Sequence, residues 1–404
     1  MVPLGTFLLI SFVFVSCGGS LVTDYFSSLH WLHNSNLDLG SKDVSISEGS
    51  YLSSCPCLDV SLCFPIRGNP VRKKEIYGFL PPNSPDGINW THVTTLAWVK
   101  PENKDVICEA HSHGVRVIAE TGPLIFSWDV EERQAWAYDK LAQIERSFMD
   151  GLVFDYEDPE PPKSDRAIQY SLLIRDTARI FHEANPSYQI STCVAWSPYN
   201  IDGRWYNITA LAMYSDLIYV MDYDTRSQIT DSCVASANSP FPGTAFGIRR
   251  YLDIGINANK IVLGVPWYGY RYECLPGTKL VDRLCPIKQV PFRGVNCSDA
   301  AGQQIEYGRI QDIIESAHPR VKYDDYMKAP YFNVLEKQRN RNGGIGVVQY
   351  WFDNPESLKV KYRFARDTGL LGVGPFAFYQ VYTKLNPRKS QPMWSAFDAF
   401  IYAD

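Results

Sequence analysis

Short apolar runs alternate with longer amphipathic stretches along most of the chain. Eight runs rich in β-branched and aromatic residues predict eight β-strands. They are EIYGF (75–79), VTTLAWV (93–99), RVIAETG (116–122), GLVFDYE (151–157), YQISTCVAW (188–196), LIYVMDY (217–223), KIVLGVPWYG (260–269) and LGVGPFAF (371–378). Residues 129–149 and 164–185 show helical spacing, and strands that alternate with helices indicate a parallel sheet. Eight such units predict an α/β fold, the (β/α)8 TIM barrel.

Two parts of the chain fall outside this repeat. The stretch from about 271 to 368, between the seventh and eighth strands, is too long for one crossover and holds three cysteines, which predicts a disulfide-containing insertion. The apolar stretch from Pro3 to Ser16 ends in small residues and is typical of a secretory signal, with lipidation of Cys17 as an alternative. We therefore expect a signal peptide (1–20), a poorly ordered leader (21–54) and a folded domain (55–404).

The cysteines and sequons agree with a secretory route. Of the ten cysteines, Cys17 lies in the signal and Cys193 in a buried strand, so we expect Cys193 to be a free thiol and the other eight to form four disulfides. Metal binding is the competing interpretation, but no histidine accompanies the cysteines at zinc-site spacing. Asn89, Asn207 and Asn296 each begin an N-glycosylation sequon.

Composition excludes several classes of protein. With 45% hydrophobic and 21% charged residues and a mean hydropathy of -0.20, the 404-residue chain is neither disordered nor a multi-spanning membrane protein. A net charge of -5 and the lack of any Lys/Arg block argue against a nucleic-acid partner. The 14% aromatic content suits stacking on sugars, although a generously aromatic core explains most of it. We expect a globular monomer with no membrane span after signal removal.

Candidate catalytic residues follow the fourth strand. Barrel enzymes place their site at the carboxyl ends of the strands. In DGLVFDYE, a period of two puts Val153, Asp155 and Glu157 on the face toward the barrel interior. Two neighbouring carboxylates repel each other, which raises at least one pKa and provides a proton donor suited to glycoside cleavage. The alternative is that both cap the next helix or pair with lysines, a role that Asp158 fits better.

The sixth strand adds a second polar group at the same end of the barrel. It ends in MDYD, where Asp222 and Asp224 flank Tyr223. A phenol and further carboxylates would then project into the same basin. A tyrosine among acids at a strand end is also a common hydrogen-bonded rim residue, and that alternative stays open here.

These motifs resemble those of the glycoside hydrolase 18 chitinase family. DGLVFDYE resembles the family's DGxDxDxE signature, MDYD its MxYD motif and LGVPWYG its LGxPxYG motif. The resemblance covers roughly 75 to 404. The runs AWSPYNID, VPFRG followed by CSDAAG, and YWFDNPESL are similar to the family's lysosomal branch.

The resemblance implies a role for each matching residue. Glu157 matches the general acid, and Asp155 the carboxylate that orients the substrate's acetamido group. Tyr223 matches the phenol that hydrogen-bonds the acetamido carbonyl, and Asp224 is its neighbour in the motif, with Asp222 on the other side. In this substrate-assisted scheme the acetamido oxygen attacks the anomeric carbon, so the configuration is retained and neither metal nor cofactor is required.

The sequence departs from the family at two positions. Val153 replaces the first aspartate of DxDxE, which removes a proton-sharing partner of Asp155 and puts the usual pH profile in doubt. Phe376 stands where the branch has a tryptophan that floors the sugar subsite. Further candidates for sugar contact are aromatic, and each tryptophan among them could equally be a packing residue: Trp196, Trp267, Tyr268 and Trp351.

The resemblance implies an exo-acting glycosidase in the lysosome. Its expected substrate is an N-acetylglucosamine oligosaccharide with β-1,4 bonds, from the chitobiose core of Asn-linked glycans or from chitin fragments, attacked at the reducing end. Two rivals remain, a non-catalytic chitin-binding lectin on the same fold and a secreted endochitinase. The lectin usually lacks the acid, and Glu157 is present.

Overall fold

The computed structural model describes residues 53–67, 74–80, 87–225, 232–339, 343–382 and 387–402. The predicted signal peptide (1–20) and all but the last two residues of the predicted leader (21–54) lie outside the described residues. In the described ranges, every helix is too short or too polar to cross a membrane.

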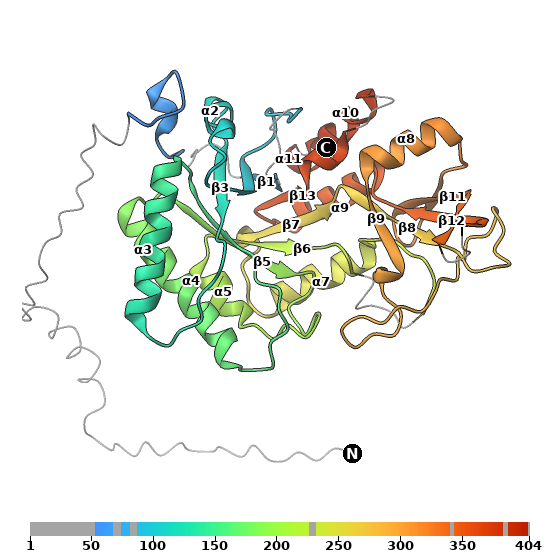
Figure 1. Cartoon of the computed structure of the whole chain (residues 1–404), viewed down its shortest axis with the longest axis horizontal. Coiled ribbons are helices and arrows are strands. Elements are labelled where there is room, and N and C mark those ends of the chain that lie inside the picture. Colours follow the sequence, from blue (N-terminus) through green and yellow to red (C-terminus); the bar gives the residue numbers. More distant parts are fainter. Residues whose placement is uncertain are drawn as a thin grey trace, which may run out of the picture. The chain divides into compact units, whose positions relative to one another are not determined.

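Eight parallel strands of the described chain close into a barrel, as predicted (Figure 1). In chain order they are β1 (Glu75–Phe79), β2 (Thr95–Val99), β3 (Arg116–Glu120), β4 (Gly151–Phe154), β5 (Gln189–Ala195), β6 (Leu217–Met221), β7 (Ile261–Pro266) and β13 (Gly372–Phe376). Around the barrel the order is β1-β13-β7-β6-β5-β4-β3-β2. Each barrel strand therefore pairs with the barrel strands before and after it in the chain, and β13 closes the barrel against β1. All eight expected strands are confirmed.

Side-chain alternation along each strand separates the barrel interior from its helical shell. On β4, Val153 packs in an inner cluster that includes Cys193 and Tyr219. Leu152 and Phe154, one position to either side, pack in the outer core under the helices. This alternation confirms the predicted two-residue period. If it continues past β4, the side chains that follow point alternately into and out of the barrel mouth.

Helices cover the outside of the barrel (Figure 1). They are α2 (Asp105–Ser112), α3 (Val130–Ser147), α4 (Asp165–Ala184), α5 (Ile208–Tyr214), α7 (Phe241–Asp253), α9 (Pro355–Asp367), α10 (Gln391–Ser395) and α11 (Asp398–Ile401), whereas α8 (Tyr307–Ala317) lies in the insertion between the seventh and eighth barrel strands. Short 3-10 turns occur at η2 (Val60–Cys63), η3 (Ala258–Lys260), η4 (Asp299–Ala301), η6 (Phe378–Val381) and η7 (Pro387–Lys389). Ser164 caps α4, because its hydroxyl accepts a hydrogen bond from the Ala167 N–H at 3.1 Å. Asp155 and Glu157 therefore do not cap the helix after β4.

Between β7 and β13 the chain forms a second sheet. Its strands are β8 (Tyr268–Glu273), β9 (Gly302–Glu306), β10 (Lys322–Asp324), β11 (Ala329–Lys337) and β12 (Ile345–Trp351), and they pair antiparallel in the order β10-β11-β12-β8-β9. This sheet belongs to the insertion expected between the seventh and eighth barrel strands, and α9 then returns the chain to the barrel.

Four disulfides and one free thiol occur among the described cysteines, as predicted. The disulfides are Cys55–Cys63, Cys57–Cys108, Cys233–Cys297 and Cys274–Cys285. Cys193 is free and buried. Of the three sequon asparagines, Asn207 and Asn296 are exposed and Asn89 is half-buried, and their glycosylation stays a prediction.

Candidate active site

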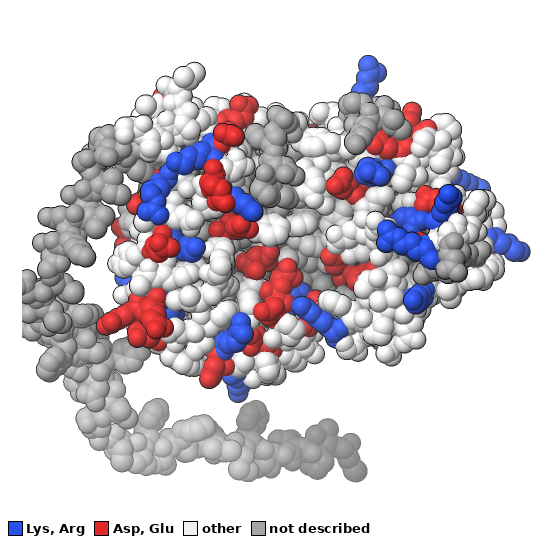
Figure 2. Space-filling view, in the orientation of Figure 1, with Lys and Arg blue, Asp and Glu red and all other residues white. Residues whose placement is uncertain are grey.

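A cavity of about 480 Å³ lies where the carboxyl ends of the barrel strands meet the insertion. Its wall is formed by Phe79, Trp98, Asp155, Glu157, Ala195, Trp196, Ile201, Asp202, Arg204, Met221, Tyr223, Asp224, Tyr268, Tyr270, Phe292, Arg293, Asp299, Gln304 and Phe376. In Figure 2, acidic side chains gather in the middle of the face shown. Cavities of about 300–1,000 Å³ are typical of small-molecule sites, and this one lies within that range.

Asp155 lies deep in the cavity at the end of β4. Its Oδ1 atom is buried and has no hydrogen-bond partner among the described residues. Burial and, secondarily, the charge of Glu157 raise the pKa of Asp155 from 3.8 to about 7, although Arg204 and a hydrogen bond with Cys193 oppose this shift. Val153 fills the neighbouring inner position on β4, and the thiol of Cys193 on β5 lies beside Asp155 and hydrogen-bonds it.

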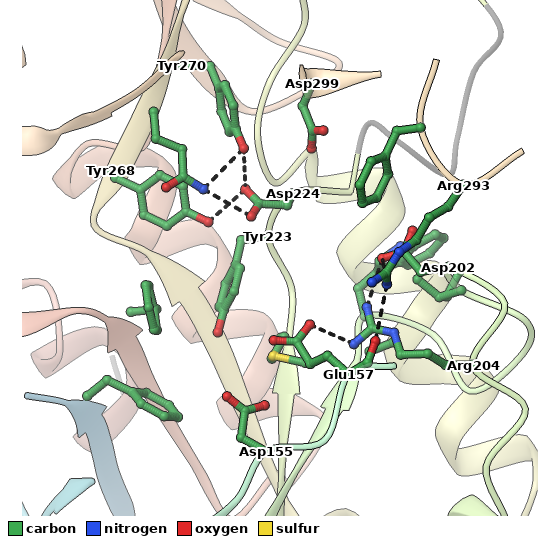
Figure 3. A pocket seen from close by; sticks show the side chains of 18 of the residues that line it. Asp155, Glu157, Asp202, Arg204, Tyr223, Asp224, Tyr268, Tyr270, Arg293 and Asp299 are labelled. Atoms are coloured by element: carbon green, nitrogen blue, oxygen red, sulfur yellow. Dashed lines mark hydrogen bonds and ion pairs between the residues drawn. The ribbon is translucent and has the colours of Figure 1, made fainter. Parts of the chain in front are cut away.

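Glu157 points to the middle of the cavity and forms an ion pair (Figure 3). Its Oε2 atom accepts a hydrogen bond from Nη1 of Arg204 at 2.8 Å, and its side chain is 50% exposed. Arg204 is buried and donates from Nη2 to Asp202 at 3.0 Å. The carboxylate therefore has a fixed cation on one side and open cavity on the other.

Tyr223 and Asp224 lie on the opposite wall, beyond the end of β6. Burial raises the pKa of Tyr223 well above its usual range, so its hydroxyl stays a hydrogen-bond donor. The Oδ1 atom of Asp224 accepts from the hydroxyls of Tyr268 at 2.7 Å and Tyr270 at 2.9 Å. Burial raises the pKa of Asp224 to about 6, while these two phenols lower it. These contacts fix Asp224 firmly in the wall beside Tyr223.

Aromatic rings form a continuous surface beside these polar groups. Phe376, at the end of β13, lies 5.4 Å from Phe79, 6.1 Å from Trp98 and 5.6 Å from Tyr223 between ring centroids. Trp196 also lines the cavity and is largely buried. Several rings thus form the floor of the cavity. Trp98 places an indole next to Phe376, the position at which the family resemblance implied a tryptophan.

Asp222 is not part of the cavity, and its prediction as a substrate-binding residue is wrong. Its side chain points out of the barrel and is buried, and its Oδ2 atom accepts from Ser239 at 2.7 Å and Thr244 at 2.5 Å. Lys361 donates to the same Ser239 hydroxyl at 2.8 Å. Asp222 follows the two-residue alternation of β6, which places it on the outer face while Tyr223 faces inward.

Trp267 and Trp351 are packing residues, so their prediction as sugar platforms is also wrong. Both indoles are 0% exposed. Trp267 lies on the outer face after β7 and packs edge-on against Trp394 at 4.9 Å. Trp351 stacks on Tyr331 at 4.6 Å within the insertion. A ring with no accessible face cannot stack on a sugar, so the packing alternative holds for both.

Sequence reasoning missed twelve of the 19 residues of the cavity wall, among them Trp98, Arg204 and Arg293. Trp98 comes near the end of β2, so the strand-end rule that identified Asp155 would have found it. Arg204 and Arg293 come from loops, and Glu157, which both contact, is far from each of them in the sequence. Their positions could not be inferred from strand patterns.

Comparison with known proteins agrees with this geometry. A family model, glycosyl hydrolases family 18, matches residues 120–380. The chain belongs to this family. Family 18 membership makes it a glycoside hydrolase, and its matched region contains the carboxylates that follow β4.

Relatives in family 18 cover most of the chain. The di-N-acetylchitobiase of Rattus norvegicus is 36% identical over 323 residues, which are 79% of this chain and 85% of the relative. A probable di-N-acetylchitobiase 2 of Dictyostelium discoideum is 36% identical over 359 residues, covering 86% of this chain and 90% of the relative. The crystal structure of a family 18 chitinase from Cycas revoluta in complex with (GlcNAc)3 has a TM-score of 0.63 at 18% identity, covering 81% of this chain and 99% of that chain, and it shows the shared fold.

Proposed function

We propose that this family 18 enzyme is an exo-acting glycosidase that hydrolyses β-1,4 bonds between N-acetylglucosamine residues. Its substrates are the chitobiose core of Asn-linked glycans and short chito-oligosaccharides. The observation that carries the proposal is the placement of Asp155, Glu157 and Tyr223 around one cavity of modest volume. The names of the relatives, di-N-acetylchitobiases, support the same substrate class.

In the proposed first step, the acetamido group of the substrate is the nucleophile. Glu157 donates a proton to the glycosidic oxygen as the bond to the anomeric carbon breaks, and the acetamido oxygen bonds to that carbon. Asp155 accepts a hydrogen bond from the acetamido N–H, and Tyr223 donates one to its carbonyl oxygen. The Asp155 contact strengthens as positive charge spreads over the oxazolinium ring and makes the N–H a stronger donor, so it contributes mainly to the transition state. The Tyr223 contact holds the acetamido oxygen in position to attack the anomeric carbon.

In the second step, water opens the oxazolinium ion with retention. Glu157, now a carboxylate, accepts a proton from the attacking water. Arg204 supports this charged form through the 2.8 Å ion pair. Asp155, with its pKa raised to about 7, holds little negative charge in acid, so repulsion toward Glu157 is small under those conditions.

End-labelled chitotetraose and a deacetylated substrate test the proposal. The purified protein should release single N-acetylglucosamine units from the reducing end, and glucosamine dimer should be inert. Tyr223→Phe, which removes one hydroxyl, should lower kcat more than it changes KM for di-N-acetylchitobiose. Binding of oligosaccharide without cleavage would indicate a lectin, and internal cleavage an endochitinase. Cleavage of glucosamine dimer at a comparable rate would require a protein nucleophile and refute the mechanism.

The disulfides support a location on the secretory route, because such bonds persist in oxidising compartments. We propose the lysosome as the site of action, with secretion as the alternative, and residues 55–404 as the catalytic domain. The monomeric state stays a prediction. Fractionation of cells that express the tagged full chain, alongside lysosomal and secreted marker enzymes, distinguishes the two locations.

A further inference from the structure

A short hairpin of the insertion, residues 290–298, reaches the wall of the cavity. We call it the Arg293 hairpin. Its base is closed by Ser298, whose N–H and hydroxyl both donate to the carbonyl of Val290, at 3.1 and 2.9 Å. Cys297 is bound to Cys233, which ties the base to the segment between β6 and α7. These links hold the hairpin in place independently of any ligand.

The tip of the hairpin is a tight two-residue turn. Phe292 and Val295 exchange N–H to carbonyl hydrogen bonds of 3.0 Å in both directions, and Arg293 and Gly294 lie between them. Both tip residues have positive φ, 42° at Arg293 and 93° at Gly294. Such turns favour glycine, asparagine or aspartate at both positions, so an arginine is costly there. The contacts of the Arg293 side chain are therefore the candidate reason for an arginine at this position.

The Arg293 side chain crosses from the insertion to two loops of the barrel. Its Nη1 atom donates to the main-chain carbonyl of Glu157 at 3.2 Å and lies 3.8 Å from Oδ2 of Asp202. Its guanidinium lies over the ring of Phe292, 5.2 Å from the centroid. One side chain thus joins the hairpin to the loops after β4 and β5, next to the proposed acid.

The position of Arg293 relative to Glu157 indicates which sugar it meets. In Figure 3, Glu157 lies between Asp155 and Tyr223 on one side and Arg204 and Arg293 on the other. The proposed mechanism places the sugar that carries the acetamido nucleophile over Asp155 and Tyr223. Because Glu157 protonates the oxygen between the two sugars, the leaving sugar lies on the Arg293 side.

We propose that the Arg293 hairpin ends the substrate cavity behind a single leaving sugar. Arg293 is then a specificity-determining residue that restricts cleavage to N-acetylglucosamine oligosaccharides whose leaving sugar is unsubstituted at its reducing end. A longer or tagged leaving group would meet the bridge between Arg293, Asp202 and the Glu157 main chain. This inference rests on the proposed function, and it assigns the exo action to one side chain.

Arg293→Gly is the variant that isolates this side chain. Glycine adopts positive φ freely, so the turn should keep its shape while the bridge is lost. Arg179→Ala is the matched control, because Arg179 is an exposed arginine on α4 whose partner is Glu183. Each protein is incubated with chitotetraose and with chitotetraose bearing a bulky aromatic amine tag at its reducing end, and the products are separated.

In the first turnovers, the wild-type protein and the control should convert untagged tetraose only to N-acetylglucosamine and trisaccharide, and should leave the tagged form nearly intact. In the same early samples, Arg293→Gly should produce the disaccharide as well, and it should cleave the tagged substrate at least about tenfold faster than wild type. An unchanged product pattern in the variant, or an equal loss of rate on both substrates, overturns the inference. Disaccharide formed by the wild-type protein in the first turnovers also overturns it, whereas a wild-type protein inert on all chito-oligosaccharides refutes the proposed function itself.

Discussion

Replacing Asp155 with asparagine should stabilise the folded protein at neutral pH and leave its stability unchanged in acid. Folding raises the pKa of Asp155 to about 7 from its usual 3.8, mainly through burial and secondarily through Glu157. The folded state therefore holds this proton more tightly than the unfolded chain. The carboxyl does not reduce stability below pH ~4, and its destabilising effect grows as pH rises to ~7 and is complete above that.

The size of this effect follows from the two pKa values. A shift from 3.8 to about 7 corresponds to about 4 kcal/mol of unfolding free energy at 25 °C. Asparagine is neutral at every pH and has nearly the same shape as protonated aspartate. The gain in stability of Asp155→Asn over wild type should therefore be near zero at pH 4 and approach a few kcal/mol at pH 8.

Urea unfolding at pH 4 and pH 8, with the disulfides intact, measures this gain. Asp325→Asn, at a side chain that is 94% exposed, is a suitable control for the exchange of aspartate for asparagine away from the cavity. In Glu157→Gln, one cause of the raised pKa of Asp155 is removed, so the pH-dependent loss of stability should be smaller than in wild type. Equal stability of Asp155→Asn and wild type at pH 8 would refute the conclusion that the ionised Asp155 carboxylate destabilises the folded protein at that pH.

Three further predictions concern catalysis. Glu157→Gln should lower kcat by about 10²–10⁴-fold with KM nearly unchanged, and unchanged turnover would exclude Glu157 as the acid. Val153→Asp should restore a proton-sharing partner beside Asp155 and move one limb of the pH–rate curve by on the order of one pH unit, and a curve that stays in place would contradict this coupling. Phe376→Trp should raise kcat/KM for short substrates by roughly two- to tenfold, since an aromatic contact contributes about 0.5–1.5 kcal/mol. A fall in kcat/KM would mean that Trp98 and its neighbours already fill the space.

The sequence predicted the barrel and the centre of the site because both depend on local patterns. Eight apolar runs identify the strands, and alternation along the fourth strand places Asp155 and Glu157 inward. The same alternation, applied to β6, would have placed Asp222 on the outer face. Asp222 was assigned to the site because it belongs to the MDYD motif. Its odd or even position along the strand, which decides the face that a side chain occupies, was not applied.

The rest of the cavity depends on contacts between distant segments. Arg204 lies 47 positions from Glu157 and Arg293 lies 136 positions from it. The Arg204 contact requires the folded barrel to bring the loops after β4 and β5 together, and the Arg293 contact also requires the disulfide-linked insertion. Neither arginine sits at a strand end, so no periodicity in the sequence marks it as part of the site.

The buried thiol of Cys193 is a natural site for chemical labelling inside the barrel. It is 2% exposed, and burial raises its pKa well above the usual range, so alkylating reagents that require a thiolate cannot react while the barrel is closed. The disulfides remove the other described cysteines from this chemistry. The rate at which Cys193 is alkylated therefore reports how often the barrel opens, without any engineered probe. Because Cys193 lies beside Asp155, a ligand that holds the barrel closed should slow that labelling.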